Sequence, residues 1–169
     1  MVGLQSLDLP IGVRIPVSQP NFMDEWHETP VRVRYAETDQ MGIAHHANYL
    51  IWFETGRSDF CRARGFSYKE MEDEDDALLV VAESYCRYKQ PAYYDEPLII
   101  RTRIGEVRSR SIRFVYEVVR ESGDELIAEG ETLHLVTGKD KKVRTLPEIY
   151  RHRLMGQNVQ AFPANKAPS

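Results

Sequence analysis

Apolar and polar residues alternate with a period of two from Val31 onward, which is the pattern of a strand that buries one face. Val31, Val33 and Tyr35 fall on one side of this pattern, and Arg32 and Arg34 fall on the other. The alternation predicts a first strand that begins at Val31 and runs into a turn.

The next apolar pattern is helical. Between Ala44 and Ala63, apolar residues recur every three or four positions, which places them on one face of a helix. Gly65 follows as a typical helix end. Leu50 and Ile51 widen the apolar stripe beyond a single face. We therefore expect a central helix that is largely surrounded by other structure.

Alternation returns after the acidic stretch from Glu70 to Asp76, which we expect to be a solvated loop. Ser122 and Gly123 are suited to a hairpin turn, so the neighbouring strands are expected to be antiparallel. A short last helix is predicted to begin at Pro147. The four strands are predicted near Leu78–Lys89, Pro97–Val107, Ser111–Glu121 and Glu125–Thr137.

One strand, one long helix and a four-stranded antiparallel meander predict an α+β fold, in which a curved sheet of about five strands wraps around the helix. The length of 169 residues and the hydrophobic content of 42% fit a single domain with its own core. We expect that domain to span residues 30–155. It would follow an N-terminal extension, residues 1–29, and precede a C-terminal tail, residues 156–169.

Charge and composition exclude several classes of protein. The net charge of −4 argues against a nucleic-acid-binding protein, which needs a basic face. No apolar run approaches the roughly 20 residues of a membrane-spanning helix, and the N-terminus lacks a signal-peptide pattern, so we expect a cytoplasmic protein. Cys61 and Cys86 have no CxxC spacing, which indicates neither a zinc site nor a disulfide framework.

The segment between the first strand and the helix concentrates the candidate chemistry. The first N–H groups of a helix lack intrahelical partners and carry positive potential, so they can stabilise an oxyanion. Asp39 lies just upstream of this position, and Gly42 allows a ligand to approach the backbone closely. A carboxylate beside an oxyanion site is an arrangement for acyl transfer.

A thioester is a suitable substrate for so small a set of groups. Its thiolate has a pKa of about 8.5 and leaves without a strong general acid. Asp39 could activate a water molecule as a general base, or it could attack the carbonyl carbon and form a mixed anhydride. The sequence leaves both routes open. It also allows Asp39 to be only a turn or helix-capping residue.

A set of residues in this region keeps a fixed spacing: Tyr35, Thr38, Asp39, Gly42, His46, Tyr49, Phe53 and Glu54. The spacing resembles the signature of the 4-hydroxybenzoyl-CoA thioesterase family, which includes acyl-CoA thioesterases of the Tol–Pal cluster. The resemblance implies the hotdog fold, Asp39 as the catalytic carboxylate and a backbone N–H near His46 that polarises the thioester carbonyl. It also implies homodimers or homotetramers with active sites between subunits, CoA as part of the substrate, and neither metal nor cofactor.

Two further side chains are candidate catalytic groups. Another branch of hotdog thioesterases places its carboxylate on the helix nine residues after a histidine, and His45 and Glu54 have that spacing. Glu54 could instead pair locally with Arg57 or Ser58. His46 could orient Asp39 or the substrate through a hydrogen bond. His45 and His46 are adjacent and point in different directions, so we expect no metal site there.

Substrate-binding candidates surround this segment and occur again near the end of the sheet. The first group comprises Gly42, His45, Asn48 and Tyr49. Two basic clusters could bind the phosphates of CoA, namely Arg108 with Arg110, and Lys139, Lys141 and Lys142 with Arg144. The same clusters could dock an acyl carrier protein, and a non-catalytic acyl-binding protein is the remaining alternative.

Overall fold

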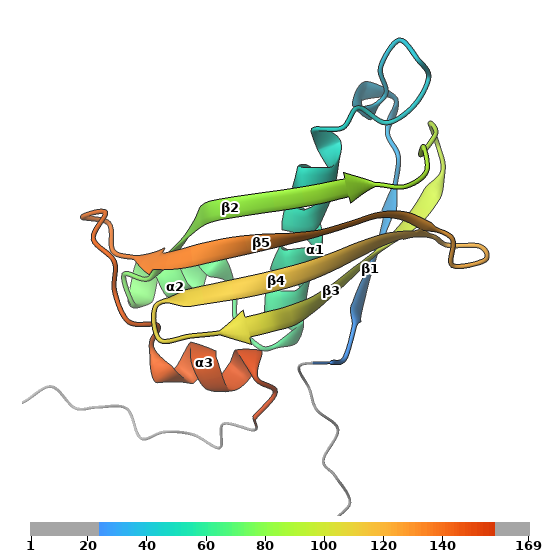
Figure 1. The fold of residues 1–169 in the computed structure, drawn as a ribbon. Helices are drawn as coiled ribbons and strands as arrows, with labels where there is room; N and C mark the ends of the chain where they lie inside the picture. The colour runs from blue at the N-terminus through green and yellow to red at the C-terminus, as the bar shows by residue number, and fades with distance from the viewer. Residues whose placement is uncertain (1–23, 158–169) are drawn as a thin grey trace, which may run out of the picture.

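The computed structural model describes residues 24–157, which form one antiparallel sheet with helices beside it (Figure 1). The elements are β1 (His27–Arg32), the 3-10 turn η1 (Tyr35–Glu37), α1 (Asn48–Ala63), α2 (Tyr68–Glu74), β2 (Leu78–Tyr88), β3 (Pro97–Val107), β4 (Ser111–Arg120), β5 (Leu126–Thr137) and α3 (Glu148–Leu154). The strand order is β1-β3-β4-β5-β2, with every neighbouring pair antiparallel. The predicted α+β class with five strands is confirmed.

Helix α1 crosses one face of the sheet and buries the stripe that its spacing predicted (Figure 1). Phe53 is fully buried and stacks on Tyr116 of β4, with ring centroids 4.4 Å apart. Gly56 lets the helix approach β3, because a Cβ there would lie 2.6 Å from the Thr102 hydroxyl. The opposite side of α1 differs from the prediction. Leu50 and Ile51 remain 41% and 49% exposed, so other structure does not surround this helix in a single chain.

Two predicted boundaries differ from the structure. Strand β1 begins at His27, so three residues assigned to the N-terminal extension belong to the sheet. The remainder of that extension, residues 1–23, lies outside the described residues. The acidic stretch forms α2, which was predicted as a loop. Ser67 accepts a hydrogen bond from the Glu70 N–H, while the Glu70 carboxylate accepts one from the Ser67 N–H. This capping box was a helix-start signal in the sequence.

A chain of polar side chains lies within the core between α1 and the sheet. Arg57 of α1 donates to the Tyr116 hydroxyl at 3.3 Å, and that hydroxyl is 2.7 Å from the Thr132 hydroxyl. Thr132 in turn lies 2.8 Å from Nε2 of His134. Burial, helped by the positive charge of Arg57, lowers the pKa of His134 to about 3. His134 is therefore neutral in the folded protein at ordinary pH.

The burial of neutral His134 predicts acid sensitivity. In the unfolded chain the imidazole binds a proton near pH 6.5, whereas in the folded chain it stays neutral until about pH 3. Stability is therefore lost as the pH falls through this window, by up to about 1.4 kcal/mol per pH unit. Urea titrations of wild type and His134→Gln between pH 7 and pH 4 measure the effect. The variant should show the shallower pH dependence, and parallel curves would contradict this origin.

Candidate active site

The loop that contains Asp39 is closed by its own backbone. The Asp39 N–H donates to the Ile43 carbonyl at 2.9 Å, and the Gly42 N–H donates to the Asp39 carbonyl at 3.0 Å. Gly42 has a φ of +77°, a left-handed conformation that favours glycine. The Met41 N–H donates to Oδ1 of Asp39 at 2.8 Å. One carboxylate oxygen is thus held by the turn, and within the described residues Oδ2 has no hydrogen-bond donor.

Glu37 anchors this loop to the core, although no pattern in the sequence indicated this role. Its carboxylate accepts hydrogen bonds from the Arg34 backbone at 2.7 Å and from Nε1 of Trp52 at 3.1 Å. Burial alone raises the pKa of this carboxyl, but these bonds and the Arg34 side chain lower it below its usual value. The Glu37 carbonyl accepts from the His45 N–H and from the Asn48 side chain. Glu37 therefore ties the loop to the start of α1.

The start of α1 offers a free backbone donor. No side chain caps the helix, and the N–H groups of Asn48 and Tyr49 donate to the carbonyls of His45 and His46. The Ala47 N–H donates to Nδ1 of His45 at 3.2 Å. In the part of the chain that is described, no acceptor receives the His46 N–H. This group is available to a ligand oxygen, and the positive end of the helix dipole favours negative charge there.

A cavity of about 480 Å³ brings the loop, the helix and the end of β2 together. Its lining includes Asp39, His46, Tyr49 and Tyr88. The Tyr88 hydroxyl donates to the His46 carbonyl at 3.0 Å, and its ring meets that of Tyr49 edge to face. The volume lies within the range of small-molecule sites. The cavity therefore combines a carboxylate, a helix start and aromatic walls.

The remaining candidates near the loop are not among the residues that line the cavity. His45 is exposed, with its ring centroid 4.1 Å from that of His46. The Asn48 side chain turns toward the Glu37 carbonyl and neither caps α1 nor lines the cavity. Gly42 shapes the turn. Glu54 is exposed on α1 and, among the described residues, forms no salt bridge with Arg57.

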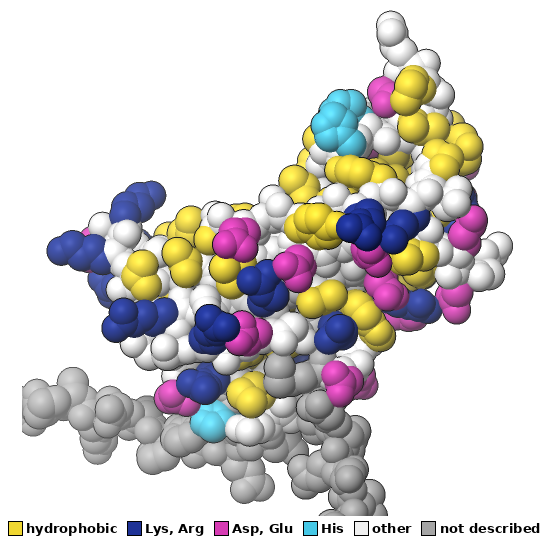
Figure 2. All heavy atoms as spheres, viewed as in Figure 1, with side chains coloured by type: hydrophobic (Ala, Val, Ile, Leu, Met, Phe, Trp, Pro, Cys, Tyr) yellow, Lys and Arg dark blue, Asp and Glu magenta, His cyan; other side chains and the backbone are white. Residues whose placement is uncertain are grey.

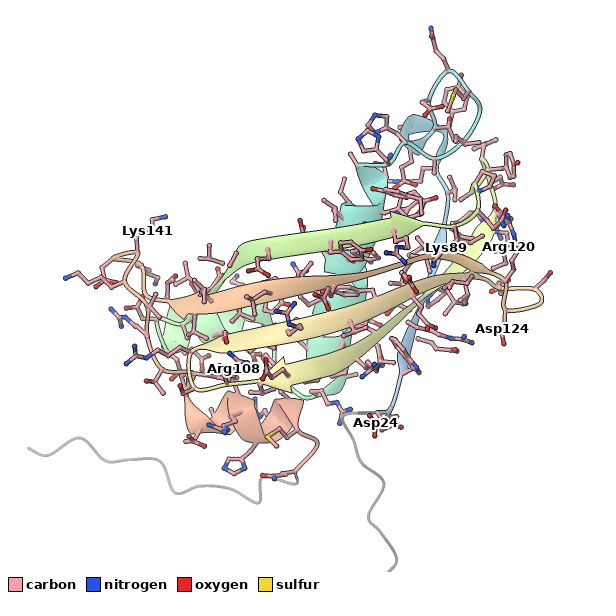
Figure 3. All side chains as sticks on the ribbon, viewed as in Figure 1. Asp24, Lys89, Arg108, Arg120, Asp124 and Lys141 are labelled. Atoms are coloured by element: carbon pink, nitrogen blue, oxygen red, sulfur yellow. The ribbon has the colours of Figure 1, made fainter. Side chains whose placement is uncertain are left out.

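The basic candidates lie at the other end of the sheet. Arg108 and Arg110 belong to the turn between β3 and β4, whereas the cavity lies beside the end of β2. Figure 3 shows Arg108 and Lys141 toward the end of the sheet opposite Lys89, which lines the cavity. Arg108 also pairs with Glu106 at 2.8 Å. Within one chain, the structure does not bring these arginines to Asp39.

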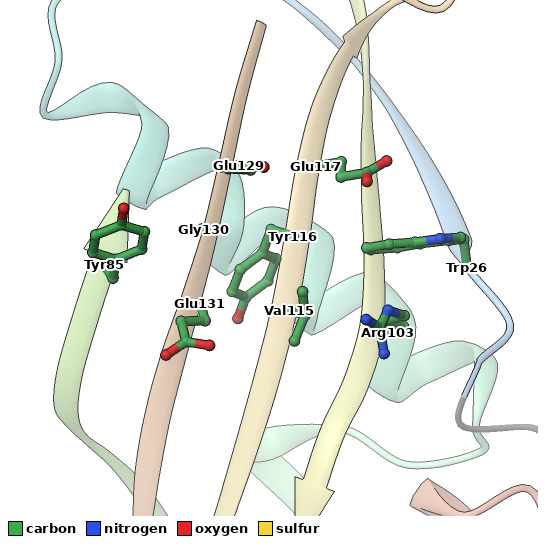
Figure 4. Close-up of a pocket in the computed structure, with 9 residues that line it drawn as sticks. All are labelled: Trp26, Tyr85, Arg103, Val115, Tyr116, Glu117, Glu129, Gly130 and Glu131. Atoms are coloured by element: carbon green, nitrogen blue, oxygen red, sulfur yellow. The ribbon is translucent and has the colours of Figure 1, made fainter. Parts of the chain in front are cut away.

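A second hollow, of about 530 Å³, lies on the sheet face that α1 does not cover (Figure 4). Arg103 packs over the Trp26 ring at 4.9 Å, and Val115 lies between Arg103 and Glu131. The carboxylates that line it are paired, since Glu131 pairs with Arg113, Glu129 pairs with Lys89 and Glu117 pairs with Arg101. This hollow offers no unpaired nucleophile or helix N-terminus comparable to those of the first cavity.

Residues 24–157 contain neither a metal-binding cluster nor a membrane-spanning helix. No group of three His, Cys, Asp or Glu side chains in this range is arranged to hold a metal ion. None of the helices there is long and apolar enough to cross a membrane.

Known proteins resemble this chain in sequence and structure. Residues 33–162 match the family described as the thioesterase-like superfamily. The acyl-CoA thioester hydrolase YbgC of Escherichia coli O6:H1 is 34% identical over 120 residues, which cover 70% of this chain and 88% of that protein. The DHNA-CoA thioesterase structure from Staphylococcus aureus has 32% identity and a TM-score of 0.68, covering 72% of this chain and 80% of that one.

A structure of 4-hydroxybenzoyl-CoA thioesterase in complex with 4-hydroxybenzoyl-CoA is similar in fold. It has a TM-score of 0.69 and 19% identity, and the match covers 76% of this chain and 98% of that one. With the family match, these likenesses confirm the hotdog fold that the sequence resemblance implied.

Proposed function

This chain belongs to the thioesterase-like superfamily, as the spacing around Asp39 predicted, and we propose that it hydrolyses acyl-CoA to a carboxylic acid and CoA. Its relatives include thioester hydrolases, and the chain is an enzyme of that class. The observation that carries the proposal is the shared cavity of Asp39 and His46. A thioester bound there would have a carboxylate and a free N–H beside it.

The His46 N–H would bind the thioester carbonyl oxygen. Negative charge develops on this oxygen as the tetrahedral intermediate forms, and a fixed donor at a helix start stabilises it without reorganisation. The contact from Tyr88 to the His46 carbonyl supports this role, because it holds the peptide that follows the N–H. The turn around Gly42 would let the substrate reach this backbone.

Asp39 would act through its unpaired oxygen, by one of two routes. As a general base it takes a proton from water, the water oxygen bonds to the carbonyl carbon, and the C–S bond then breaks. As a nucleophile its own oxygen displaces the thiolate, and water hydrolyses the resulting anhydride. In both routes the sulfur leaves as a thiolate of pKa about 8.5 and then takes a proton. The hydrogen bond from Met41 supports either role by orienting the carboxylate.

The active unit would be a homodimer. Strand β2 is an edge strand, and its far side has no strand partner among residues 24–157. Val80, Val81 and Tyr85 along it are about half exposed. An open edge with apolar side chains favours pairing with another strand. Two copies of β2 paired about a two-fold axis would run antiparallel and join both sheets. A homotetramer would require a second contact between such dimers.

A substrate screen tests the proposed activity. The purified protein is assayed for thiol release from CoA thioesters with short, long and aromatic acyl groups. At least one should be hydrolysed with a kcat on the order of 1 s⁻¹ or more. Failure to hydrolyse any thioester, together with retained affinity for CoA, would contradict the proposal and support a non-catalytic acyl-binding protein. Hydrolysis of carrier-protein thioesters alone would replace CoA with that partner.

A further inference from the structure

The loop that carries Asp39 has little buried surface of its own. It leads from β1 to α1, and Figure 2 shows this end of the molecule projecting beyond the sheet. Within residues 34–43, Glu37 is the only buried residue, with 4% of its surface exposed. Glu37 is not among the residues that line the cavity. The single buried residue of this segment is thus a carboxylate that does not face the cavity.

The Glu37 carboxylate joins the start of the loop to the body of α1. Oε2 accepts a hydrogen bond from the Arg34 N–H at 2.7 Å, and Oε1 accepts one from the Arg34 guanidinium at 2.9 Å. Oε1 also accepts a hydrogen bond from Nε1 of Trp52 at 3.1 Å. Trp52 lies one turn after the start of α1 and is only 3% exposed. Because its ring is fixed in the core, Trp52 is a rigid anchor for the carboxylate.

The Glu37 carbonyl oxygen makes a second link, to the residues at the start of the helix. It accepts hydrogen bonds from the His45 N–H at 2.7 Å and from Nδ2 of Asn48 at 2.8 Å. His45 directly precedes His46, which presents the free N–H, and Glu37 lies two residues before Asp39. One residue therefore binds both sides of the loop, the side that leads to the carboxylate and the side that leads to the donor.

The relative position of these two reactive groups matters for hydrolysis. A displacement of about 1 Å caused by a change away from the reacting atoms can lower a rate about 100-fold. The tip of the loop offers little resistance to such a displacement, because Gln40, Met41 and Gly42 are all exposed. The contacts of Glu37 supply the connection to the core that the tip lacks.

We propose that Glu37 is a positioning residue that keeps the Asp39 carboxylate in register with the His46 N–H. The inference rests on the proposed hydrolase function, and it adds a residue that acts without touching the substrate. A carboxylate that only stabilised the fold would affect unfolding and leave turnover by the folded protein unchanged. A positioning residue affects kcat in the folded protein.

Replacement of Glu37 by glutamine tests the role in turnover. The amide has one acceptor oxygen in place of two, so it cannot keep the hydrogen bonds from both the Arg34 N–H and Trp52. For the acyl-CoA hydrolysed fastest in the screen, kcat should fall about 10- to 100-fold, with KM within about twofold of wild type. A Glu37→Gln protein with the wild-type kcat would overturn the inference.

The variant Glu70→Gln is the matched control for this replacement. Glu70 also accepts a hydrogen bond from a backbone N–H three positions earlier, that of Ser67, at 2.7 Å. It closes a capping box at the start of α2, a helix that contributes no residue to the cavity lining. Glu70→Gln should therefore leave both kcat and KM unchanged. An equal loss of kcat in Glu70→Gln would show that the effect is not specific to Glu37 and would overturn the inference.

A second control separates positioning from general stability. Phe60 is 1% exposed near the end of α1 and packs edge to face against Phe114. Phe60→Leu should lower the melting temperature by a few degrees, yet keep the wild-type kcat at temperatures where it is folded. If its kcat fell as far as that of Glu37→Gln, loss of stability alone would explain both results, and the inference would fail.

A double-mutant cycle tests whether Glu37 acts through Asp39. In the Asp39→Asn protein no reactive carboxylate remains to be positioned, so adding Glu37→Gln should lower the residual kcat by at most about threefold. That remainder would come from the His46 N–H. Losses that multiplied in full would mean that Glu37 acts independently of Asp39, which contradicts the proposal.

Amide hydrogen exchange separates this inference from the proposed function. The Asp39 and His45 N–H groups both donate hydrogen bonds within the loop. They should exchange at least about tenfold faster in Glu37→Gln than in wild type, and at the wild-type rate in Glu70→Gln. If wild type hydrolyses acyl-CoA while Glu37→Gln keeps the wild-type exchange and kcat, only the inference fails.

Two other outcomes are also decisive. If wild type hydrolyses no thioester, the proposed function fails, and the exchange rates alone decide whether Glu37 holds the loop. Faster exchange with an unchanged kcat would show that Glu37 holds the loop without serving catalysis, which would overturn the inference and leave the proposed function intact.

Discussion

Replacement of Asp39 by asparagine is expected to lower kcat for thioester hydrolysis by about 10²- to 10⁴-fold, the contribution typical of a positioned base. The amide can neither take a proton from water nor attack the carbonyl carbon. Its oxygen can still accept the hydrogen bond from the Met41 N–H, so the turn should keep its shape. Steady-state kinetics on the best acyl-CoA from the screen measures the effect, and KM should change little.

Two matched variants make the result specific. Asp73→Asn removes an exposed carboxylate from α2, far from the cavity, and should leave kcat unchanged. Glu54→Gln tests the other candidate carboxylate, which is exposed on α1 and is not part of the cavity lining. We expect it to retain most of the activity. If Glu54→Gln lost more activity than Asp39→Asn, the catalytic carboxylate would have to be reassigned to the helix.

Replacement of Val81 by lysine should separate the dimer and abolish most of its activity. Val81 is 51% exposed on the open edge strand β2. A two-fold axis near the middle of β2 would place both lysines within the contact between the two strands, where burying an unpaired charge is costly. Charged side chains are also a common way in which proteins prevent edge pairing. We expect the dissociation constant to rise at least 100-fold, which corresponds to about 2.7 kcal/mol.

Light scattering coupled to size exclusion checks this prediction. Wild type should elute with twice the mass of the chain, and Val81→Lys should elute as a monomer with an unchanged circular dichroism spectrum. Val143→Lys is a control for mass, since Val143 is similarly exposed but lies outside β2. A Val81→Lys protein that remained dimeric would exclude β2 as the contact. A fully active monomer would exclude the homodimer as the active unit.

The buried faces of most helices and strands could be predicted from sequence alone. The helical spacing of Tyr49, Trp52, Phe53 and Phe60 predicted the side of α1 that packs on the sheet. Strict alternation in the first part of β4 predicted its buried face, including Phe114 and Tyr116. These predictions succeeded because the direction of side chains repeats with the period of the local backbone. That period can be recognised from the order of neighbouring residues alone. The residues that carry the family resemblance also lie close together along the chain.

Contacts between residues far apart in the sequence could not be predicted in this way. Tyr88 contacts His46 across 42 positions of the sequence, and buried Glu37 bonds to Trp52, which no local pattern indicated. Arg108 and Arg110 were selected as binding residues by their charge, yet the sheet places them away from the cavity of their own chain. Strand order and strand length set these distances, and both depend on pairing between remote segments. Local periodicity reports the buried face of an element, but it does not report which end of that element lies beside another.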